Sequence, residues 1–291
     1  MKKTSLILLI VALSTLSVLG QEAGNRNYNQ RERRAAPNTG MIFSNGEQYI
    51  ETFVLMNAQP DEFVAVFGVA QEGSSAAESN QKVNTLIDKF LSAAEKLGVS
   101  RSNTFVDFIT QNRVYNFSPP SEGVIRETLS GFETKKTVAV RYKDRPLLEK
   151  LLAAAAQASI FDLIKVDYVI NDMTKIRARL FEEATRVVKQ KEENYIHTLG
   201  LAIRRLGLAQ ETYDTYYPGE LYRTYQAFES GVVDPYYGSN NGTRVIRERK
   251  STTSYLEPLD KSDFDAVVNS IGIEPVVQCT LYMKVLYSVA K

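Results

Sequence analysis

The sequence predicts an α+β protein built on a split βαβ sheet, in the order strand, helix, strand, strand, helix, strand. Two packed helices, a third long helix and additional C-terminal strands complete the prediction. Two observations predict this class. Short apolar or alternating runs, which are typical of strands, are separated by segments in which apolar residues recur every three to four positions, as in amphipathic helices. The chain also closes on a long alternating segment, Gln278–Val289, which predicts a final strand.

Ordered structure is expected to begin with a strand at Tyr49–Ala58, and the first half of the sheet follows at roughly Asp61 to Phe117. Phe63–Ala70 is almost continuously apolar, which predicts a strand buried on both faces. A helix then follows Ser75, because "SAAE" is a capping box in which the serine hydroxyl accepts the Glu78 amide and the glutamate reaches back. Gly98 supplies the left-handed residue that ends it. The apolar stripe of this helix comprises Val83, Leu86, Ile87, Phe90, Leu91, Ala94 and Leu97.

One more strand completes the first half, and the second half, roughly Thr134 to Asn171, has the same element order. A β-rich run at Asn103–Phe117 is interrupted by "SPPSEG" at Ser118–Gly123, and a strand resumes at Thr134–Lys143 with Val138, Val140 and Tyr142 on one face. Asp144 and Pro146 start the second helix, because proline is tolerated in a first turn. Its apolar stripe comprises Leu147, Leu148, Leu151, Leu152 and Ala155. In the next strand the packed face comprises Ile164, Val166, Tyr168 and Ile170.

Asp172 caps a third helix that we expect to run to about Leu206, with Gly207 as its stop. About 34 residues at 1.5 Å each give roughly 50 Å, so we expect part of it to project or to pack on another subunit. Its stripe comprises Ile176, Leu180, Ala184, Val187, Ile196, Leu199, Ile203 and Leu206. The apolar face of the final strand comprises Cys279, Leu281, Met283, Val285, Tyr287 and Val289. It could also end an outer-membrane barrel, but three amphipathic helices argue against that fold.

Residues 1–20 are predicted to be a secretory signal peptide, because Lys2 and Lys3 precede the short apolar core Leu6–Leu19. An uncleaved anchor is the alternative, which the short core disfavours. We expect periplasmic localisation, with outer-membrane association or secretion left open, and no transmembrane segment after cleavage. Residues 21–48 form a predicted flexible polar leader, and 49–291 one domain with a tyrosine-rich insertion at about 209–260.

The charge balance excludes two classes of partner. The full chain has a net charge of +1, and removal of the two signal lysines leaves −1. We therefore expect no nucleic-acid partner and no attraction to an anionic membrane surface. Cys279 is the only cysteine, so the chain cannot form an intramolecular disulfide.

The sequence predicts no catalytic, cofactor-binding or metal-binding residue, and we expect the protein not to be an enzyme. His197 is the only histidine and lies on the long helix without a nucleophile pattern nearby, although a catalytic role stays open. Cys279 could be a nucleophile, but the apolar face of a strand favours a buried, inert thiol. One histidine and one cysteine exclude an ordinary zinc site. We therefore expect no cofactor.

A tyrosine-rich segment is the candidate partner or ligand surface. Tyrosines stack on sugars, bind peptides and are enriched at protein interfaces. The structural alternative is a strand pair in which tyrosines cover a sheet edge, broken at Pro218–Gly219. Both interpretations stay open. The segment contains seven of the 16 tyrosines: Tyr213, Tyr216, Tyr217, Tyr222, Tyr225, Tyr236 and Tyr237.

The ordered set of elements resembles the SIMPL-domain family, which includes periplasmic immunogenic and oxidative-stress defence proteins of bacteria. The resemblance lies in "FVAVFGVAQEGSSAAESNQKVNTLIDKFLSAAEKLGV", "GFETKKTVAVRYKDRPLLEKLLAAAAQA" and "RARLFEEATRVVKQKEENYIHTLGLAI" and covers roughly Phe63 to Val289. Two departures are a third helix richer in charge and the long tyrosine-rich segment Ala209–Asp260. The resemblance implies an exported α+β domain linked to envelope or stress physiology, often self-associating, and no catalytic residue.

We therefore expect an exported, non-enzymatic envelope protein that acts through self-assembly or partner binding, in oxidative or envelope stress defence. Its expected partners are copies of itself, another envelope protein or a glycan. The alternative is a glycan- or peptide-binding module that uses the tyrosines of segment 213–237.

Overall fold

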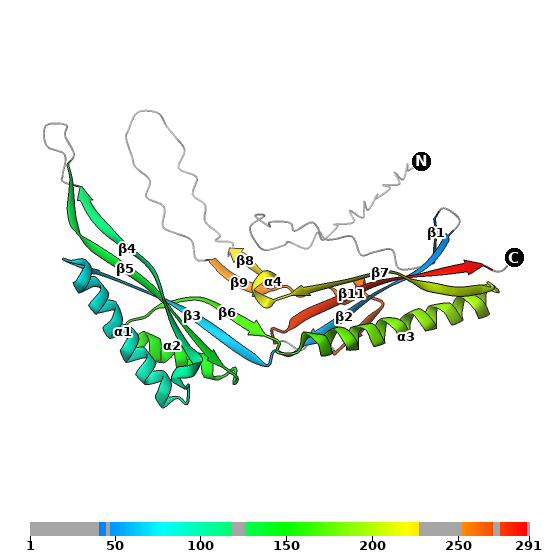
Figure 1. Ribbon diagram of the computed structural model, residues 1–291, viewed down its shortest axis with the longest axis horizontal. Helices are drawn as coiled ribbons and strands as arrows, with labels where there is room; N and C mark the ends of the chain where they lie inside the picture. Colours follow the sequence, from blue (N-terminus) through cyan, green and yellow to red (C-terminus); the bar gives the residue numbers. More distant parts are fainter. Residues whose placement is uncertain (1–40, 45–46, 118–125, 227–251, 270–273, 290–291) are drawn as a thin grey trace, which may run out of the picture. The chain divides into compact units, whose positions relative to one another are not determined.

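The computed structural model describes residues 41–44, 47–117, 126–226, 252–269 and 274–289 (Figure 1). The chain divides into two units, each treated by itself. The larger comprises Gln30–Tyr222 and Leu256–Lys291, and the smaller comprises Met1–Asn29 and Arg223–Tyr255. In the smaller unit the described residues belong to two paired strands, β8 (Tyr222–Gln226) and β9 (Thr252–Leu256). No helix among the described residues is long and apolar enough to cross a membrane.

A four-stranded sheet in the larger unit confirms the split βαβ prediction. Its strand order is β4-β5-β3-β6, and every neighbouring pair is antiparallel. Two helices belong to it, and a short 3₁₀ turn, η1 (Arg101–Asn103), precedes β4. The elements are β3 (Glu62–Gly73), α1 (Ala76–Lys96), β4 (Thr104–Phe117), β5 (Glu127–Tyr142), α2 (Leu147–Gln157) and β6 (Asp162–Val169).

The helices α1 and α2 share one hydrophobic core with one face of this sheet. Along β3, buried and half-buried residues alternate, so the prediction that this strand is buried on both faces is wrong. Only the face that meets the helices is closed, and the valines of the opposite face stay half-buried. The buried core includes Phe63, Ala65, Phe67, Val83, Ile87, Phe90, Val138, Val140, Leu151 and Ala155.

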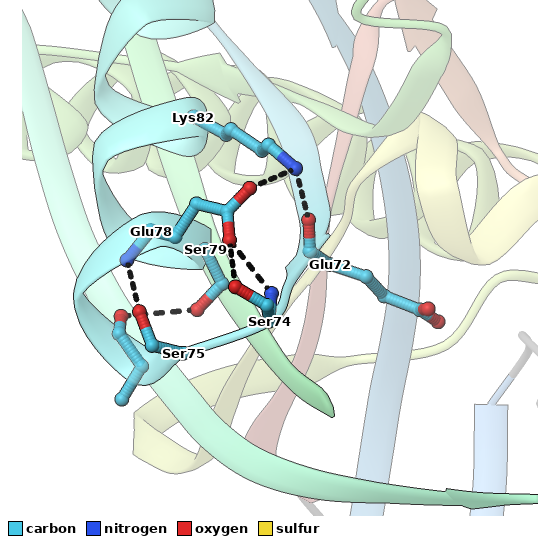
Figure 2. A network of polar contacts seen from close by, with 7 residues as sticks. Glu72, Ser74, Ser75, Glu78, Ser79 and Lys82 are labelled. Carbon is cyan, nitrogen blue, oxygen red and sulfur yellow. Dashed lines mark hydrogen bonds and ion pairs between the residues drawn. The ribbon is translucent and has the colours of Figure 1, made fainter. Parts of the chain in front are cut away.

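The N-terminus of α1 confirms the predicted cap, with one change. The Ser75 hydroxyl accepts the Glu78 amide at 3.2 Å. The Glu78 carboxylate, however, accepts the amide and the hydroxyl of Ser74, one residue beyond the cap (Figure 2). Gly98 follows the helix with φ of +92°, as its role of helix stop requires.

The second helix begins later than predicted. Pro146 occupies the cap position without a side-chain bond, and the Asp144 carbonyl, not its carboxylate, accepts the Leu147 amide at 2.9 Å. The apolar stripe is also shifted, because Leu152 is exposed whereas Ala154 is buried.

A bulge in β6 reverses the predicted packing of its first half. The register shifts between Val66 and Phe67, whose partners are Lys165 and Leu163, so Ile164 has no partner in β3. The extra residue turns Leu163 toward the core and leaves Ile164 exposed. The prediction that Ile164 packs is therefore wrong, while Val166 and Tyr168 pack as predicted.

The larger unit also contains a five-stranded sheet. Its order is β1-β2-β11-β7, and β10 pairs parallel to β2 while the other pairs are antiparallel. Figure 1 shows α3 lying along β2 and β11. The elements are β1 (Met41–Ser44), β2 (Glu47–Ala58), α3 (Met173–Leu199), β7 (Ile203–Tyr216), β10 (Ala266–Val268) and β11 (Val277–Val289), with a one-turn helix α4 (Pro218–Leu221) and a 3₁₀ turn η2 (Lys261–Asp263) in the connections.

The long helix α3 begins at its predicted cap but ends early. The Asp172 carboxylate accepts the Lys175 amide at 2.9 Å, as predicted. The helix stops at Gly200, whose φ is +64°, so Ile203 and Leu206 belong to β7. The predicted end near Leu206 is therefore wrong.

The length of α3 does not make it project. Its 27 residues span about 40 Å. Strands β2 and β11, of 12 and 13 residues, also span about 40 Å. The helix therefore matches the sheet that it covers, and its buried side chains Leu180, Ala184, Val187 and Val188 pack on that sheet.

Two predicted boundaries also change. Strands β1 and β2 occupy residues 41–44 and 47–48, so the C-terminal part of the predicted leader is strand. The predicted insertion at about 209–260 begins inside β7, which pairs with β11 as far as Tyr216. The predicted signal peptide, residues 21–40 and the interruption Ser118–Gly123 lie outside the described residues.

Candidate protein-interaction surface

Strand β4 forms one edge of the four-stranded sheet and carries the largest group of exposed apolar side chains on a single described strand. We call this group, with one neighbour from β5, the β4 surface. Its members are between 43% and 71% exposed. They are Phe105, Phe108, Ile109, Tyr115 and Phe117 of β4 and Leu129 of β5.

The pairing of β4 with β5 distributes these side chains over both faces of the sheet. Phe108 lies opposite Lys136, whose ammonium bonds Asn84 of α1, and therefore points to the helix-covered face. Phe105 points to the other face. Ile109 is skipped in the register, which places a bulge in the middle of the edge. Apolar groups therefore flank the strand on both sides of its outer edge.

The far end of β4 extends beyond the rest of the sheet. Strand β3 ends at Gly73, opposite Phe132, so residues 114–117 and 127–131 pair only with each other. This two-stranded extension, the β4–β5 tip, carries Tyr115, Phe117 and Leu129. A two-stranded ribbon alone is marginally stable in water, and a third strand or a covering layer is what usually stabilises it.

The base of the tip is held tightly. A Cβ on Gly131 would lie 2.6 Å from the Gly73 carbonyl oxygen, so only glycine permits the close approach of β3 and β5 there. Gln111 of β4 donates to the Ala76 carbonyl and to the Thr134 hydroxyl, at 2.9 and 3.1 Å. These bonds tie β4 to the start of α1 and leave the tip to extend from a fixed base.

The N-terminus of α1 beside this base is already occupied by the chain's own carboxylate. Glu78 forms an ion pair with Lys82 at 2.8 Å and accepts from Ser74 (Figure 2). The hydrogen bond from Lys82, with those from Ser74, lowers the pKa of Glu78 to about 2. A helix N-terminus that binds external anions needs open amides, and Glu78 and Ser75 fill this role internally. We therefore assign this network to the scaffold.

The charges on β4 balance. Asp107 and Arg113 are its charged residues, and the adjacent β5 pair Lys135 and Glu133 is joined at 3.0 Å. Exposed edge strands are commonly protected by lysines or inward-pointing charges. Apart from the bulge, which is itself a protective feature, this edge has one charge of each sign and no lysine, so its surface is apolar and nearly neutral.

A depression of about 450 Å³ lies at the other end of the same sheet. Its charged groups compensate one another, because the Glu62 carboxylate lies 3.8 Å from Arg141 and 3.6 Å from Lys143. The depression therefore presents no excess charge to a ligand.

The tyrosines predicted as one surface are divided among several sites. Tyr213 packs against the core under α3, Arg177 lies 5.5 Å from its ring centroid, and burial raises its pKa to about 12. Tyr216 ends β7, and Tyr225 lies on β8 of the smaller unit. Tyr217 and Tyr222 are exposed at the two ends of α4. Tyr236 and Tyr237 lie outside the described residues.

Tyr222 is the last residue of this segment in the larger unit, and it bonds another residue of that unit. Its hydroxyl bonds that of Tyr168, and burial, followed by the charge interaction with Tyr222, raises the pKa of Tyr168. One of the predicted surface tyrosines therefore has a packing role within the larger unit.

The two residues weighed for catalysis lie in different settings. His197 is exposed in the last turn of α3. Cys279 is 1% exposed in β11, and burial raises the pKa of its thiol. Among the described residues, no group of three or more His, Cys, Asp or Glu side chains is arranged to hold a metal ion.

Reasoning from the sequence found β4 as a strand but missed its exposure. The sequence does contain a signal of this exposure. Apolar residues of β4 occur at odd and at even positions, such as Phe105 and Phe108, and so belong to both faces of the strand. Such a pattern fits a strand buried on both faces as well as an exposed edge, so strand order was needed to decide.

The model of one protein family matches residues 56–253, and its description reads "SIMPL: Protein of unknown function (DUF541)". The match runs from β2 through β9 and so includes the β4 surface and most of the tyrosine-rich segment. The chain matches none of the curated proteins.

Proposed function

The chain belongs to the SIMPL family, described as a protein family of unknown function (DUF541), and from this premise we propose that it acts by binding protein partners rather than by catalysis. The proposal places the protein in the bacterial envelope, exported through residues 1–20, with a role in oxidative or envelope stress defence. The signal-like start of the sequence and the resemblance to exported stress-defence proteins support this placement.

The observation that carries the proposal is the β4 surface. Interfaces are enriched in aromatic side chains and poor in charge at their centre, and the exposed Phe105, Phe108 and Phe117 lie along an edge with only Asp107 and Arg113 as charges. An open edge strand also offers its backbone amides and carbonyls for strand addition. Contact area and directional backbone bonds are therefore available at the same place.

The settings of His197 and Cys279 support a non-catalytic role. A nucleophilic thiol needs access and a lowered pKa, and Cys279 has neither. A general base needs a neighbouring group that orients it. His197, the only histidine, is exposed on a helix surface.

The proposal is tested by restoring peroxide and envelope-stress survival to a strain that lacks the gene. We expect the wild-type protein to restore survival and the Phe105→Lys/Phe117→Lys variant to fail, because two charges on the β4 surface oppose desolvation by a partner. The matched control is Phe161→Lys/Phe181→Lys, which changes two exposed phenylalanines elsewhere and should restore survival.

Equal exported amounts of all three proteins are confirmed by immunoblot of the periplasmic fraction. Full survival with Phe105→Lys/Phe117→Lys would overturn the β4 surface as the functional site. Absence of the wild-type protein from the periplasmic fraction would overturn the placement in the envelope.

A second candidate is a glycan- or peptide-binding module, favoured by the exposure of Tyr217 and Tyr222 at the ends of α4. Exposed tyrosines stack on sugars and bind peptides. The same survival assay separates the two candidates. Tyr217→Ala should abolish rescue under the second proposal and leave it intact under the first.

A further inference from the structure

We infer that the β4 surface binds a second copy of the chain, whose own β4 adds antiparallel to the first. The inference rests on the proposed function, because it names the partner of that surface. An edge strand that pairs with its own copy forms an isologous, closed contact, the kind on which most dimers are built. It would join two four-stranded sheets into one continuous sheet.

The β4–β5 tip supplies the first argument. Residues 114–117 have β5 on one side and no strand on the other among the described residues. If two β4 strands overlap along their whole length, residues 104–107 of the second copy lie beside residues 114–117 of the first. The second copy thus provides the third strand that the tip lacks.

The register of such a pair follows from the faces of β4. Residues that lie directly opposite in an antiparallel pair point to the same face of the sheet. With Ile109 bulged, Thr110 and Asn112 share the uncovered face, since they pair with Lys135 and Glu133 of β5. Full overlap about Gln111 therefore sets Thr110 of one copy opposite Asn112 of the other, on the same face.

The charges are compatible with this register. Asp107 falls opposite Val114 of the second copy, and Arg113 falls opposite Phe108, both on matching faces. No like charges meet, and a guanidinium beside an aromatic ring is a favourable pairing.

The available area also fits a dimer. The six side chains of the β4 surface are 43% to 71% exposed, which corresponds to on the order of 600 Å² if each covers about 200 Å². A specific interface buries about 800 Å² per partner. Pairing of the two edges covers part of this side-chain area, and the strand backbone and neighbouring polar groups add to the area that is buried.

The register is tested with cysteines in the full chain. Under mild oxidation, Thr110→Cys/Asn112→Cys should form a disulfide-linked dimer, because Cβ atoms of opposed residues lie about 5 Å apart. Each single variant should stay unlinked alone, and a mixture of the two should link. Lys165→Cys/Asp167→Cys, a pair of exposed positions with the same spacing on β6, should not link. The native Cys279 is buried and does not compete.

The mass in solution is tested by light scattering at micromolar concentration. The wild-type protein should have the mass of two chains or a multiple of it, and Phe108→Lys should reduce it to one chain. Ile164→Lys, an exposed apolar residue on the opposite edge strand, should leave the mass unchanged. Circular dichroism confirms that each variant is folded.

A wild-type monomer, or a dimer that Phe108→Lys leaves intact, would overturn the second copy as the partner. A dimer that links through single Thr110→Cys instead would overturn the register. Neither result would remove the proposed function, because the survival assay addresses the β4 surface whatever partner it binds.

Discussion

Tyr142 and Tyr287 are buried tyrosines on inner strands, β5 and β11, and they differ in what surrounds the hydroxyl. The Tyr287 hydroxyl lies 3.3 Å from Arg205 Nε, which donates to it, and donates to Glu192 at 3.2 Å. The Tyr142 hydroxyl has no hydrogen-bond partner among the described residues. Burial raises the pKa of each to about 12.

Replacing each tyrosine by phenylalanine tests how much the hydrogen bonds of its hydroxyl contribute to stability. We expect Tyr142→Phe to change the free energy of unfolding at pH 7 by less than about 1 kcal/mol, because no protein hydrogen bond is lost. Tyr287→Phe should lower it by about 1.5 to 3 kcal/mol, because bonds to charged groups are lost. Urea denaturation measures both. Equal losses would contradict the difference in hydrogen bonding.

The raised pKa values of Tyr142 and Tyr287 predict that the free energy of unfolding depends on pH. A tyrosine whose pKa rises from 10.0 to about 12 on folding keeps its proton in the folded state after the unfolded chain has released it. Its contribution to stability is therefore complete below pH 10 and is lost as the pH rises from about 10 to about 12. Tyr142→Phe should reduce the fall in stability over this range, measured by the same denaturation at each pH.

At the level of elements, the bulge in β6 shows how one residue changes a strand's packing. Alternation predicts Ile164 in the core, yet the extra residue places Leu163 there and leaves Ile164 57% exposed. The bulge cannot be read from the strand alone, because it arises from the register with β3.

A pair of alanine substitutions tests the bulge. Leu163→Ala should lower the free energy of unfolding by about 2 kcal/mol, because a packed side chain is lost from the core. Ile164→Ala should cost about 1 kcal/mol or less, since its side chain is mainly in solvent. Thermal or urea denaturation compares the two, and a larger loss for Ile164→Ala would mean that the strand alternates without the bulge.

The end of α3 is a second case in which the choice between two glycines decides an element. Both Gly200 and Gly207 could stop the helix, and the apolar spacing continues through Ile203 and Leu206. The structure uses Gly200, at φ of +64°, because the residues after it pair with β11. Pairing with the neighbouring strand β11, which is a tertiary interaction, outweighs the helical periodicity of the sequence there.

At the scale of the whole molecule, the two sheets of the larger unit differ in how the chain builds them. The four-stranded sheet and its core use one continuous stretch, from Glu62 to Val169. The five-stranded sheet combines β2 with β7 and β11 from the far end of the chain, and β11 is hydrogen-bonded on both sides.

Truncation before Val277 removes β11 and should therefore destabilise the five-stranded sheet but not the four-stranded sheet. We expect β2 and β7 to lose amide-exchange protection, because each loses its neighbour β11, while β3 and β5 keep theirs. Hydrogen exchange followed by mass spectrometry compares the truncated and full-length chains. Loss of protection in β3 and β5 as well would show that the two sheets unfold as one unit.

The two sheets also differ in how their edges are covered. Between β1 and β10, residues 51–53 of β2 have no strand beside them on that edge. An ion pair fills this gap, because the Lys191 ammonium lies 2.7 Å from the Asp265 carboxylate. Lys191 donates to the Glu51 carbonyl, and Asp265 accepts the Phe53 amide. The chain thus closes that edge with a half-buried ion pair. Strand β4 has no comparable closure among the described residues, which is why the proposed interaction surface lies on it.

Local patterns in the sequence predict the class of fold and the inward faces of most elements. Local patterns are enough for this: Ser75 and Asp172 cap helices, Gly98 ends one, and the alternation of Val138, Val140 and Tyr142 gives the inward face of β5. Each of these signals acts over a few residues, so a linear reading detects it.

Which strands lie at an edge, and which aromatic residues stay exposed, depends on long-range contacts that no local pattern reveals. Phe67 and Phe108 are both phenylalanines of predicted strands, but one is 1% and the other 56% exposed. The difference follows from strand order and helix coverage, which depend on contacts between residues far apart in the chain. For the same reason Tyr213, which is crowded among tyrosines in the sequence, packs against the core, whereas the apolar side chains of β4 stay exposed at a sheet edge.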